Sequence, residues 1–247
     1  MSDISKDLQI IGKNPVLEAI HDGKEIERVY LLQGTTGDFE KALRHLCRTK
    51  DIPMQIIPKE RMFKVNRGNN QGVVAILPLV QYYKIEDVIA HCYENGKVPL
   101  ILLLDSVTDV RNLGGIARSA VSYGVDAIVV PTTGSAPIQS DSVKASAGAL
   151  LKIQICRVPS LVNTVEYLQE SGLQVYATNL EARESIEEID LKVPLAIIIG
   201  SEDDGVSPHL LRAANRKVKI PQLEAMESLN VSVATGIVLY EVFKQRR

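Results

Sequence analysis

The sequence predicts an α/β protein with a parallel sheet in its C-terminal part and a smaller α/β domain before it. From residue 98 onward, apolar runs of strand length alternate with helical patterns. The runs Leu100–Leu104 and Leu195–Ile199 contain no polar residue, as is typical of parallel strands that are buried on both faces. In residues 8–80, strand and helix patterns alternate a second time over a shorter stretch, which indicates a separate small α/β domain.

In the C-terminal part, the patterns predict six strands and five helices. The strands are expected at Leu100–Leu104, Ala127–Val130, Ile153–Cys156, Gln174–Thr178, Leu195–Ile199 and Val218–Ile220. The helices are expected at Leu113–Tyr123, Ser140–Leu150, Leu161–Ser171, Pro208–Ala214 and Asn230–Lys244. The last helix is apolar almost all round, so it must be covered on every side. We expect its own sheet to cover one side and a second subunit to cover the other.

The N-terminal part begins with a helix at Asn14-Pro15, where proline suits the first helical position. Further elements are expected at Glu25–Leu32 (strand), Phe39–Lys50 (helix), Pro53–Ile57 (strand), Lys59–Val65 (helix) and Gly72–Leu77 (strand). Pro78–Tyr83 is expected to be a linker, and the helix Ile85–Tyr93 is closed by Asn95-Gly96. We therefore expect domains at 1–78 and 97–247, joined by a linker and helix at 79–96.

Composition and charge restrict the class of protein. The chain has three widely spaced cysteines and no Cys-x-x-Cys pair, which suits reduced thiols in the cytoplasm rather than a disulfide scaffold or a zinc site. Its four histidines are scattered without ligand spacing, so no metal is expected. The first residues do not look like a signal peptide, and no apolar run approaches a membrane span. We expect a cytoplasmic protein without membrane contact.

The net charge of −2 does not by itself indicate a nucleic-acid-binding protein. The charge is unevenly distributed, however, because residues 38–70 carry eight Lys and Arg residues against four Asp and Glu residues. Such a segment can supply contacts to phosphates, although a solvated mixed-charge surface fits it equally well.

Three polar clusters follow predicted strands, and ligands of parallel sheets bind beyond the carboxyl ends of the strands. They contain Asn112 and Arg118, then Glu202, then Ser228 and Asn230. Each has a simpler interpretation: a capping asparagine, a solvated loop carboxylate and a polar helix cap. Neither a Gly-x-Gly-x-x-Gly fingerprint nor a P-loop is present.

Taken together and in this order, the clusters resemble the three motifs of the SPOUT superfamily of RNA methyltransferases, in its TrmH/RlmB branch. The stretches are Asp109–Ala120, Ile197–Ser207 and the near-complete signature Ser228-Leu229-Asn230-Val231-Ser232-Val233-Ala234. The N-terminal segments 11–20 and 70–75 also resemble the RNA-binding domain of this branch. The resemblance implies a C-terminal trefoil knot, S-adenosylmethionine as the methyl donor and a homodimer formed through the C-terminal domain.

The resemblance also implies roles for individual residues. It assigns catalytic roles to Asn112, Arg118, Glu202, Ser228 and Asn230, and cofactor contacts to Thr178, Gly200, Ile220 and Leu229. Glu202 would orient Asn112 and Arg118. Arg118 would act either as the base for the ribose hydroxyl or, because a guanidinium is hard to deprotonate, as an electrostatic anchor.

The function implied is S-adenosylmethionine-dependent 2′-O-methylation of ribose in RNA, with a guanosine of 23S rRNA as the target. A tRNA 2′-O-methyltransferase, or an RNA-binding protein that keeps the fold without turnover, remains as an alternative. Two positions depart from the family pattern. Asn69-Asn70 stands where a histidine is common, and Asp203-Asp204 adds negative charge next to Glu202.

Overall fold

The computed structural model describes residues 8–223 and 228–247, and these form two compact units. The first contains the described residues up to Leu79 together with Ile138–Ser140. The second contains Val80–Pro137 and Asp141–Arg247. Each unit has its own sheet and its own apolar core.

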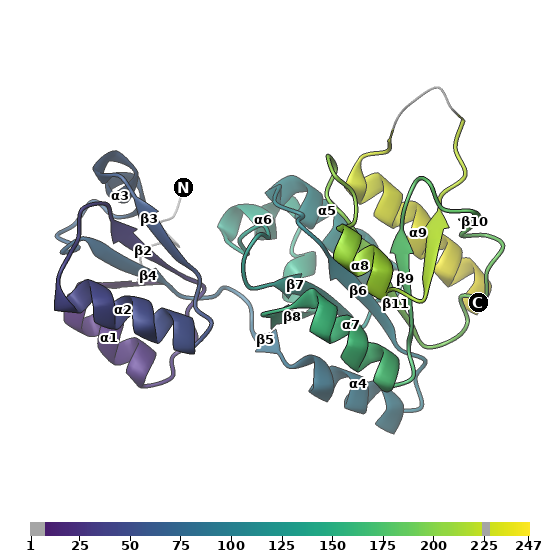
Figure 1. The fold of residues 1–247 in the computed structure, drawn as a ribbon, viewed down its shortest axis with the longest axis horizontal. Helices are drawn as coiled ribbons and strands as arrows, with labels where there is room; N and C mark the ends of the chain where they lie inside the picture. The colour runs from purple at the N-terminus through teal and green to yellow at the C-terminus, as the bar shows by residue number, and fades with distance from the viewer. Residues whose placement is uncertain (1–7, 224–227) are drawn as a thin grey trace. The chain divides into compact units, whose positions relative to one another are not determined.

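The N-terminal unit is a four-stranded sheet in the order β1 (Gln9–Ile11), β4 (Val73–Ile76), β2 (Arg28–Leu32) and β3 (Met54–Ile57). Strands β2 and β3 are parallel, while β4 is antiparallel to β1 and β2. Helices α1 (Lys13–His21) and α2 (Asp38–Thr49) pack on one face, against Val29, Leu31 and Val73. The short helix α3 (Lys59–Val65) packs on the other face, against Ile57 and Val74 (Figure 1).

The C-terminal unit contains an eight-stranded sheet in which every neighbouring pair of strands is parallel. Its order is β10 (Glu184–Ser185), β12 (Arg216–Lys219), β9 (Gln174–Thr178), β11 (Leu195–Ile199), β6 (Leu100–Leu104), β7 (Ala127–Pro131), β8 (Gln154–Val158) and β5 (Tyr82–Tyr83). The central strands β6 and β11 are buried along their whole length, which explains their uninterrupted apolar sequences.

Helices cover both faces of this sheet. On one face, α4 (Ile85–Glu94), α7 (Leu161–Glu170) and α8 (Pro208–Ala213) share a core with Leu103, Val129 and Ile198 (Figure 1). The alternate residues of the same strands, such as Leu102 and Ile197, are also fully buried. Helices α5 (Val110–Ser122) and α9 (Val231–Arg246) pack along each other. The remaining helical segments are α6 (Ser140–Ala145) and a 3₁₀ turn at Ala149–Leu151.

Several predicted elements begin or end a few residues away from their predicted bounds, and two differ more than this. Residues 82–83, expected to be part of a linker, form strand β5 and pair with Ile155 and Cys156 of β8. The helix expected over 140–150 ends at Ala145, because Ala147 and Gly148 adopt positive φ angles of 50° and 83° that a helix does not tolerate. Both differences are local and leave the predicted parallel architecture unchanged.

Helix α9 is buried along one side only. Val231, Thr235, Val238, Leu239 and Val242 face the protein interior. Val233, Ile237, Tyr240 and Phe243 are between 39% and 53% exposed in the single chain. The C-terminal end of the helix is fixed by Arg246, whose guanidinium donates hydrogen bonds of 2.7 to 3.3 Å to the carbonyl oxygens of Val98, Pro99, Leu191 and Val193.

Candidate active site

Three polar side chains that are distant in the sequence meet in one hydrogen-bonded network, which we call the Asn–Glu–Asn network: Asn112, Glu202 and Asn230. One oxygen of the Glu202 carboxylate accepts from Nδ2 of Asn112 at 3.0 Å, and the other accepts from Nδ2 of Asn230 at 3.1 Å. Nδ2 of Asn230 also donates to Oδ1 of Asn112 at 3.0 Å. The structure therefore closes a ring of three side chains, one from each of the three predicted polar clusters.

The loop after β11 holds Glu202 in a tight turn. Ser201 and Gly205 exchange two backbone hydrogen bonds of 3.0 and 3.1 Å, and Gly205 has a positive φ of 68°. Gly200 is buried so closely that a Cβ atom there would lie 1.9 Å from the carbonyl carbon of Gly205. Glycine is therefore required at position 200 for the turn to close, and the turn determines where Glu202 can reach.

Asn112 lies within the first turn of α5 rather than at its cap, which corrects the predicted start of this helix. The cap is Asp109, whose carboxylate accepts from the backbone N–H groups of Arg111 and Asn112 at 2.6 and 3.3 Å. The Asn112 side chain is therefore not used for capping and is directed at Glu202. Gly114 permits close packing of α5, because a Cβ atom there would lie 2.7 Å from Ala145.

Asn230 is the N-cap of α9, and Ser232 fixes the orientation of its side-chain amide. Oδ1 of Asn230 accepts from the backbone N–H of Ser232 at 3.0 Å and from the Ser232 hydroxyl at 2.6 Å. The amide nitrogen is thereby left to face Asn112 and Glu202. Sequence reasoning did not single out Ser232, although a serine two residues after a capping asparagine is a usable signal for this arrangement.

Arg118 and Ser228 lie outside the Asn–Glu–Asn network. Arg118 is exposed and about 120° around the helix from Asn112, since six residues at 3.6 per turn make about one and two-thirds turns. Within the described part of the chain, its guanidinium has no hydrogen-bond or ion-pair partner. Glu202, expected to orient Asn112 and Arg118, instead bonds the two asparagines. Ser228 is exposed, two residues before the cap.

Three of the four predicted cofactor residues lie at the carboxyl ends of neighbouring strands. Strands β12, β9 and β11 are consecutive neighbours in the sheet. Thr178 is the last residue of β9, while Ile220 directly follows β12 and Gly200 directly follows β11. The Thr178 hydroxyl donates to the carbonyl oxygen of Ile198 at 3.1 Å and so ties β9 to β11. Leu229 directly precedes Asn230 and is partly buried. Three backbone segments thus meet at the carboxyl ends of the strands, where ligands of parallel sheets bind.

The three cysteines are not candidates for covalent catalysis. Burial raises the pKa of Cys47 and Cys92 to about 11 and that of Cys156 to about 12, so all three are protonated thiols at neutral pH. Among the described residues, no group of three or more His, Cys, Asp or Glu side chains is arranged to hold a metal ion. Nor does the described chain contain a helix of the length and apolarity needed to cross a membrane.

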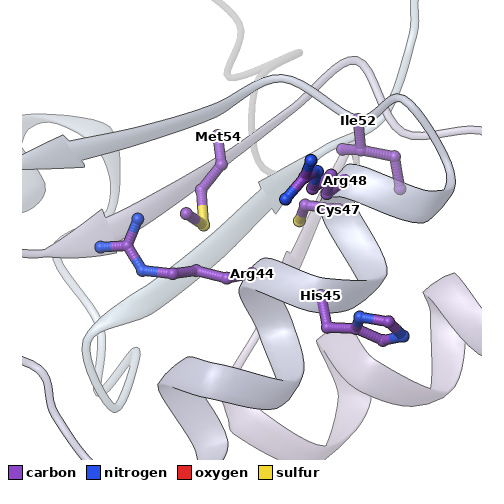
Figure 2. Close-up of a pocket in the computed structure, with 6 residues that line it drawn as sticks. All are labelled: Arg44, His45, Cys47, Arg48, Ile52 and Met54. Carbon is purple, nitrogen blue, oxygen red and sulfur yellow. The ribbon is translucent and has the colours of Figure 1, made fainter.

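A cavity of about 420 Å³ lies on the N-terminal unit between α2 and β3, and none of the predicted site residues lines it. Its walls are Arg44, His45, Cys47, Arg48, Ile52 and Met54. Figure 2 shows the arginine side chains and Met54 around the cavity, with the His45 ring directed away from them. Arg44 is ion-paired with Glu40. Because burial raises the pKa of Cys47, this cavity offers no thiolate nucleophile at neutral pH.

Comparisons with known proteins agree with the division of the chain into an N-terminal and a C-terminal unit. The model of the SpoU rRNA methylase family matches residues 99–240, and the RNA 2′-O ribose methyltransferase substrate-binding model matches residues 9–83. The chain is 32% identical, over 96% of its length and 95% of the relative, to a protein of Bacillus subtilis named as a TrmH family tRNA/rRNA methyltransferase. A Staphylococcus saprophyticus relative of the same name is 33% identical, over 98% of this chain and 97% of the relative.

Solved structures show the same fold. An S-adenosylmethionine-bound rRNA methyltransferase from Sinorhizobium meliloti superposes with a TM-score of 0.61 at 25% identity, covering 96% of this chain and 87% of that one. A TrmH family RNA methyltransferase from Porphyromonas gingivalis has a TM-score of 0.56 at 26% identity, covering 95% and 88%. On the strength of the family models and the full-length relatives, the chain belongs to the SpoU rRNA methylase family.

Proposed function

We propose that this protein methylates the 2′-oxygen of a ribose in RNA with S-adenosylmethionine as the donor, and that its target is a guanosine of 23S rRNA. The observation that carries the proposal is the convergence of Asn112, Glu202 and Asn230 beside the strand ends that bear Thr178 and Gly200. Because the names of the relatives mention both tRNA and rRNA, tRNA is the second candidate substrate.

The Asn–Glu–Asn network leaves one member free to contact the substrate. Both N–H bonds of the Asn230 amide are used, one to Asn112 and one to Glu202. Asn112 uses only one of its two N–H bonds within the network, in the bond to Glu202. Its second N–H is available to the ribose or its phosphate. We infer that Asn112 positions the nucleotide while Glu202 and Asn230 hold Asn112 in place.

Bound S-adenosylmethionine supplies an activated methyl group together with its own leaving group, so the protein mainly has to align the reactants. The backbone around Thr178, Gly200, Ile220 and Leu229 is suited to this task, because strand ends expose N–H and C=O groups that the sheet does not use. A site built from backbone groups explains why the side chains at these positions are small or apolar.

Arg118 is assigned to charge stabilisation in this proposal. A guanidinium stays protonated at physiological pH and binds phosphate oxygens through a rigid fork. The Arg118 side chain is exposed and has no partner among the described residues, so it is available for the phosphate next to the target ribose or for the developing alkoxide. Ser228 is exposed on the approach to the α9 cap and completes the proposed set.

We further infer a homodimer formed through the C-terminal unit. The exposed apolar side of α9 bears Val233, Ile237, Tyr240 and Phe243. Tyr123 of α5 adds to it through an edge-to-face contact with Tyr240 and a tilted ring contact with Phe243. An apolar patch of this kind on a helix favours burial against a second copy. The cytoplasm is the proposed compartment, since all three cysteines are free and buried.

The test is methyl transfer from labelled S-adenosylmethionine to unmodified 23S rRNA and, separately, to unmodified tRNA. Label on 23S rRNA is the expected result. Label on tRNA alone would move the target to tRNA. Label on neither RNA, with the cofactor still bound, would favour a protein that binds RNA without methylating it.

A further inference from the structure

Phe63 on α3 is a solvent-exposed aromatic ring in a chain that has few aromatic residues. Its exposed fraction is 60%, although the sequence contains only three phenylalanines and no tryptophan. Helix α3 is held on the sheet by other residues, because Met62 is buried and Val65 packs with it against Ile57 and Val74. The phenyl ring therefore contributes little to the core of this unit, and most of its surface is available to a partner outside the described chain.

Cationic residues flank Phe63 in the sequence, and the side chain of one of them, Arg67, lies over its ring. Lys59, Arg61, Lys64 and Arg67 lie within four residues of Phe63, against a single acidic residue, Glu60. All four are exposed, and the guanidinium of Arg67 lies 5.9 Å from the centroid of the Phe63 ring. Lys59, Arg61 and Lys64 form no ion pair with any residue in the described ranges. This local excess of positive charge contrasts with the net charge of −2 for the whole chain.

We propose that Phe63, together with these four cations, is a stacking platform for an unpaired base of the RNA substrate. An exposed aromatic ring offers its face to a nucleobase, and neighbouring Lys and Arg side chains contact the phosphates on either side of that base. The bases of a duplex are stacked on each other, so the ring can reach only a loop, bulge or single-stranded segment. The inference rests on the proposed function to the extent that RNA is the substrate.

Charge complementarity selects RNA over an apolar protein surface as the occupant. Covering Phe63 with an apolar partner would remove water from several unpaired cations, which is costly unless each gains a counter-charge. A phosphate backbone supplies regularly spaced negative charge, while the ring supplies a contact that tolerates any base. An anchor of this kind adds affinity without reading the sequence, so it fits a role in holding the RNA while the C-terminal unit performs the transfer.

The absence of tryptophan from the sequence provides a direct probe. In the full-length Phe63→Trp variant, the new indole is the only tryptophan and reports on its own surroundings. We expect its fluorescence to be quenched in a saturable manner by a short unstructured RNA oligonucleotide, and much less by the same sequence in a duplex. RNA that binds without changing the emission, or equal quenching by the duplex, would overturn the proposal.

Two further variants separate stacking from simple apolar contact. Stacking of one base contributes ~1–3 kcal/mol, so Phe63→Leu should raise the KM for RNA by roughly 5- to 150-fold, with kcat at saturating RNA and cofactor affinity unchanged. Phe63→Tyr keeps an aromatic ring and should stay close to the wild type. Ile56→Ala is a matched control, because Ile56 is 46% exposed in the same unit but is not on α3.

The outcomes distinguish this proposal from the proposed function. A Phe63→Leu enzyme with the KM of the wild type, or equal losses in the Leu and Tyr variants, would contradict a stacking role while leaving methyl transfer intact. A wild-type protein that methylates no RNA would contradict the proposed function, and the tryptophan titration would still decide whether RNA stacks on α3.

Discussion

Glu202→Gln is the substitution that most directly perturbs the Asn–Glu–Asn network. The carboxylate accepts one hydrogen bond on each oxygen, from Nδ2 of Asn112 at 3.0 Å and from Nδ2 of Asn230 at 3.1 Å. Glutamine has nearly the same shape but replaces one oxygen with an NH₂ group. That group faces a donor, so at least one of the two bonds is lost, and the charge that strengthens the other disappears.

The size of the effect follows from the bond that is lost. A hydrogen bond to a charged group contributes about 1.5–3 kcal/mol, which corresponds to roughly a 10- to 150-fold decrease in rate if Asn112 no longer holds the nucleotide in line. Glu202 is exposed, so water replaces part of the lost interaction, and we expect the lower half of this range. The decrease should appear in kcat, because the backbone groups proposed to bind the cofactor are unchanged.

The assay is single-turnover methyl transfer with saturating RNA and S-adenosylmethionine, combined with a separate measurement of cofactor affinity. Asp203→Asn is the matched control, since it makes the same change of charge in the same loop without touching the network. A Glu202→Gln rate within twofold of the wild type, or an equal loss in Asp203→Asn, would refute the assignment of Glu202 as the residue that positions Asn112.

Other perturbations test separate parts of the structure. Arg118→Ala should lower kcat by about 100-fold or more with near-normal cofactor affinity, and a parallel loss of cofactor binding would show that the division of roles is wrong. Arg246→Ala removes four hydrogen bonds from the end of α9 and should lower the free energy of unfolding by about 2–4 kcal/mol, measured by urea denaturation; an unchanged midpoint would contradict this. Ile237→Glu should convert the dimer to a monomer by light scattering, and a wild-type protein that is monomeric at micromolar concentration would exclude the proposed interface. Because burial raises the pKa of Cys156 to about 12, its thiol should resist alkylation in the native protein at pH 8 and react in denaturant. Alkylation of the folded protein at pH 8 would contradict the burial. The stabilisation of the folded state that comes from keeping this thiol neutral is present below pH 9 and is lost as the pH rises toward 12.

Much of the C-terminal sheet could be predicted from patterning because its strands are buried on both faces. Strands β6 and β11 extend over the residues that their apolar runs predicted. The two-residue strands β5 and β10 could not be predicted, since two residues carry no periodic signal and both pair at the ends of the sheet. The break after Ala145 was also hidden, because it depends on positive φ angles at Ala147 and Gly148 rather than on a change in apolarity.

The site was predictable only in part. Order along the chain and the motif resemblance singled out Asn112, Glu202 and Asn230 and implied that Glu202 orients Asn112, but they gave Arg118 rather than Asn230 as the second partner of Glu202. The bonds of the Asn–Glu–Asn network join residues separated by 90, 28 and 118 positions, so they depend on the tertiary fold. The supporting role of Ser232 likewise depends on its position in the first turn of α9, two residues after the cap, where its hydroxyl reaches the capping amide.

The proposed function requires that the methyl group is placed on a ribose oxygen of a guanosine. The most direct test is to incubate unmodified 23S rRNA with the protein and S-adenosylmethionine, digest the RNA to nucleosides and analyse them by mass spectrometry. We expect 2′-O-methylguanosine as the new product. A base-methylated nucleoside, or no new nucleoside from an enzyme that still binds the cofactor, would contradict it.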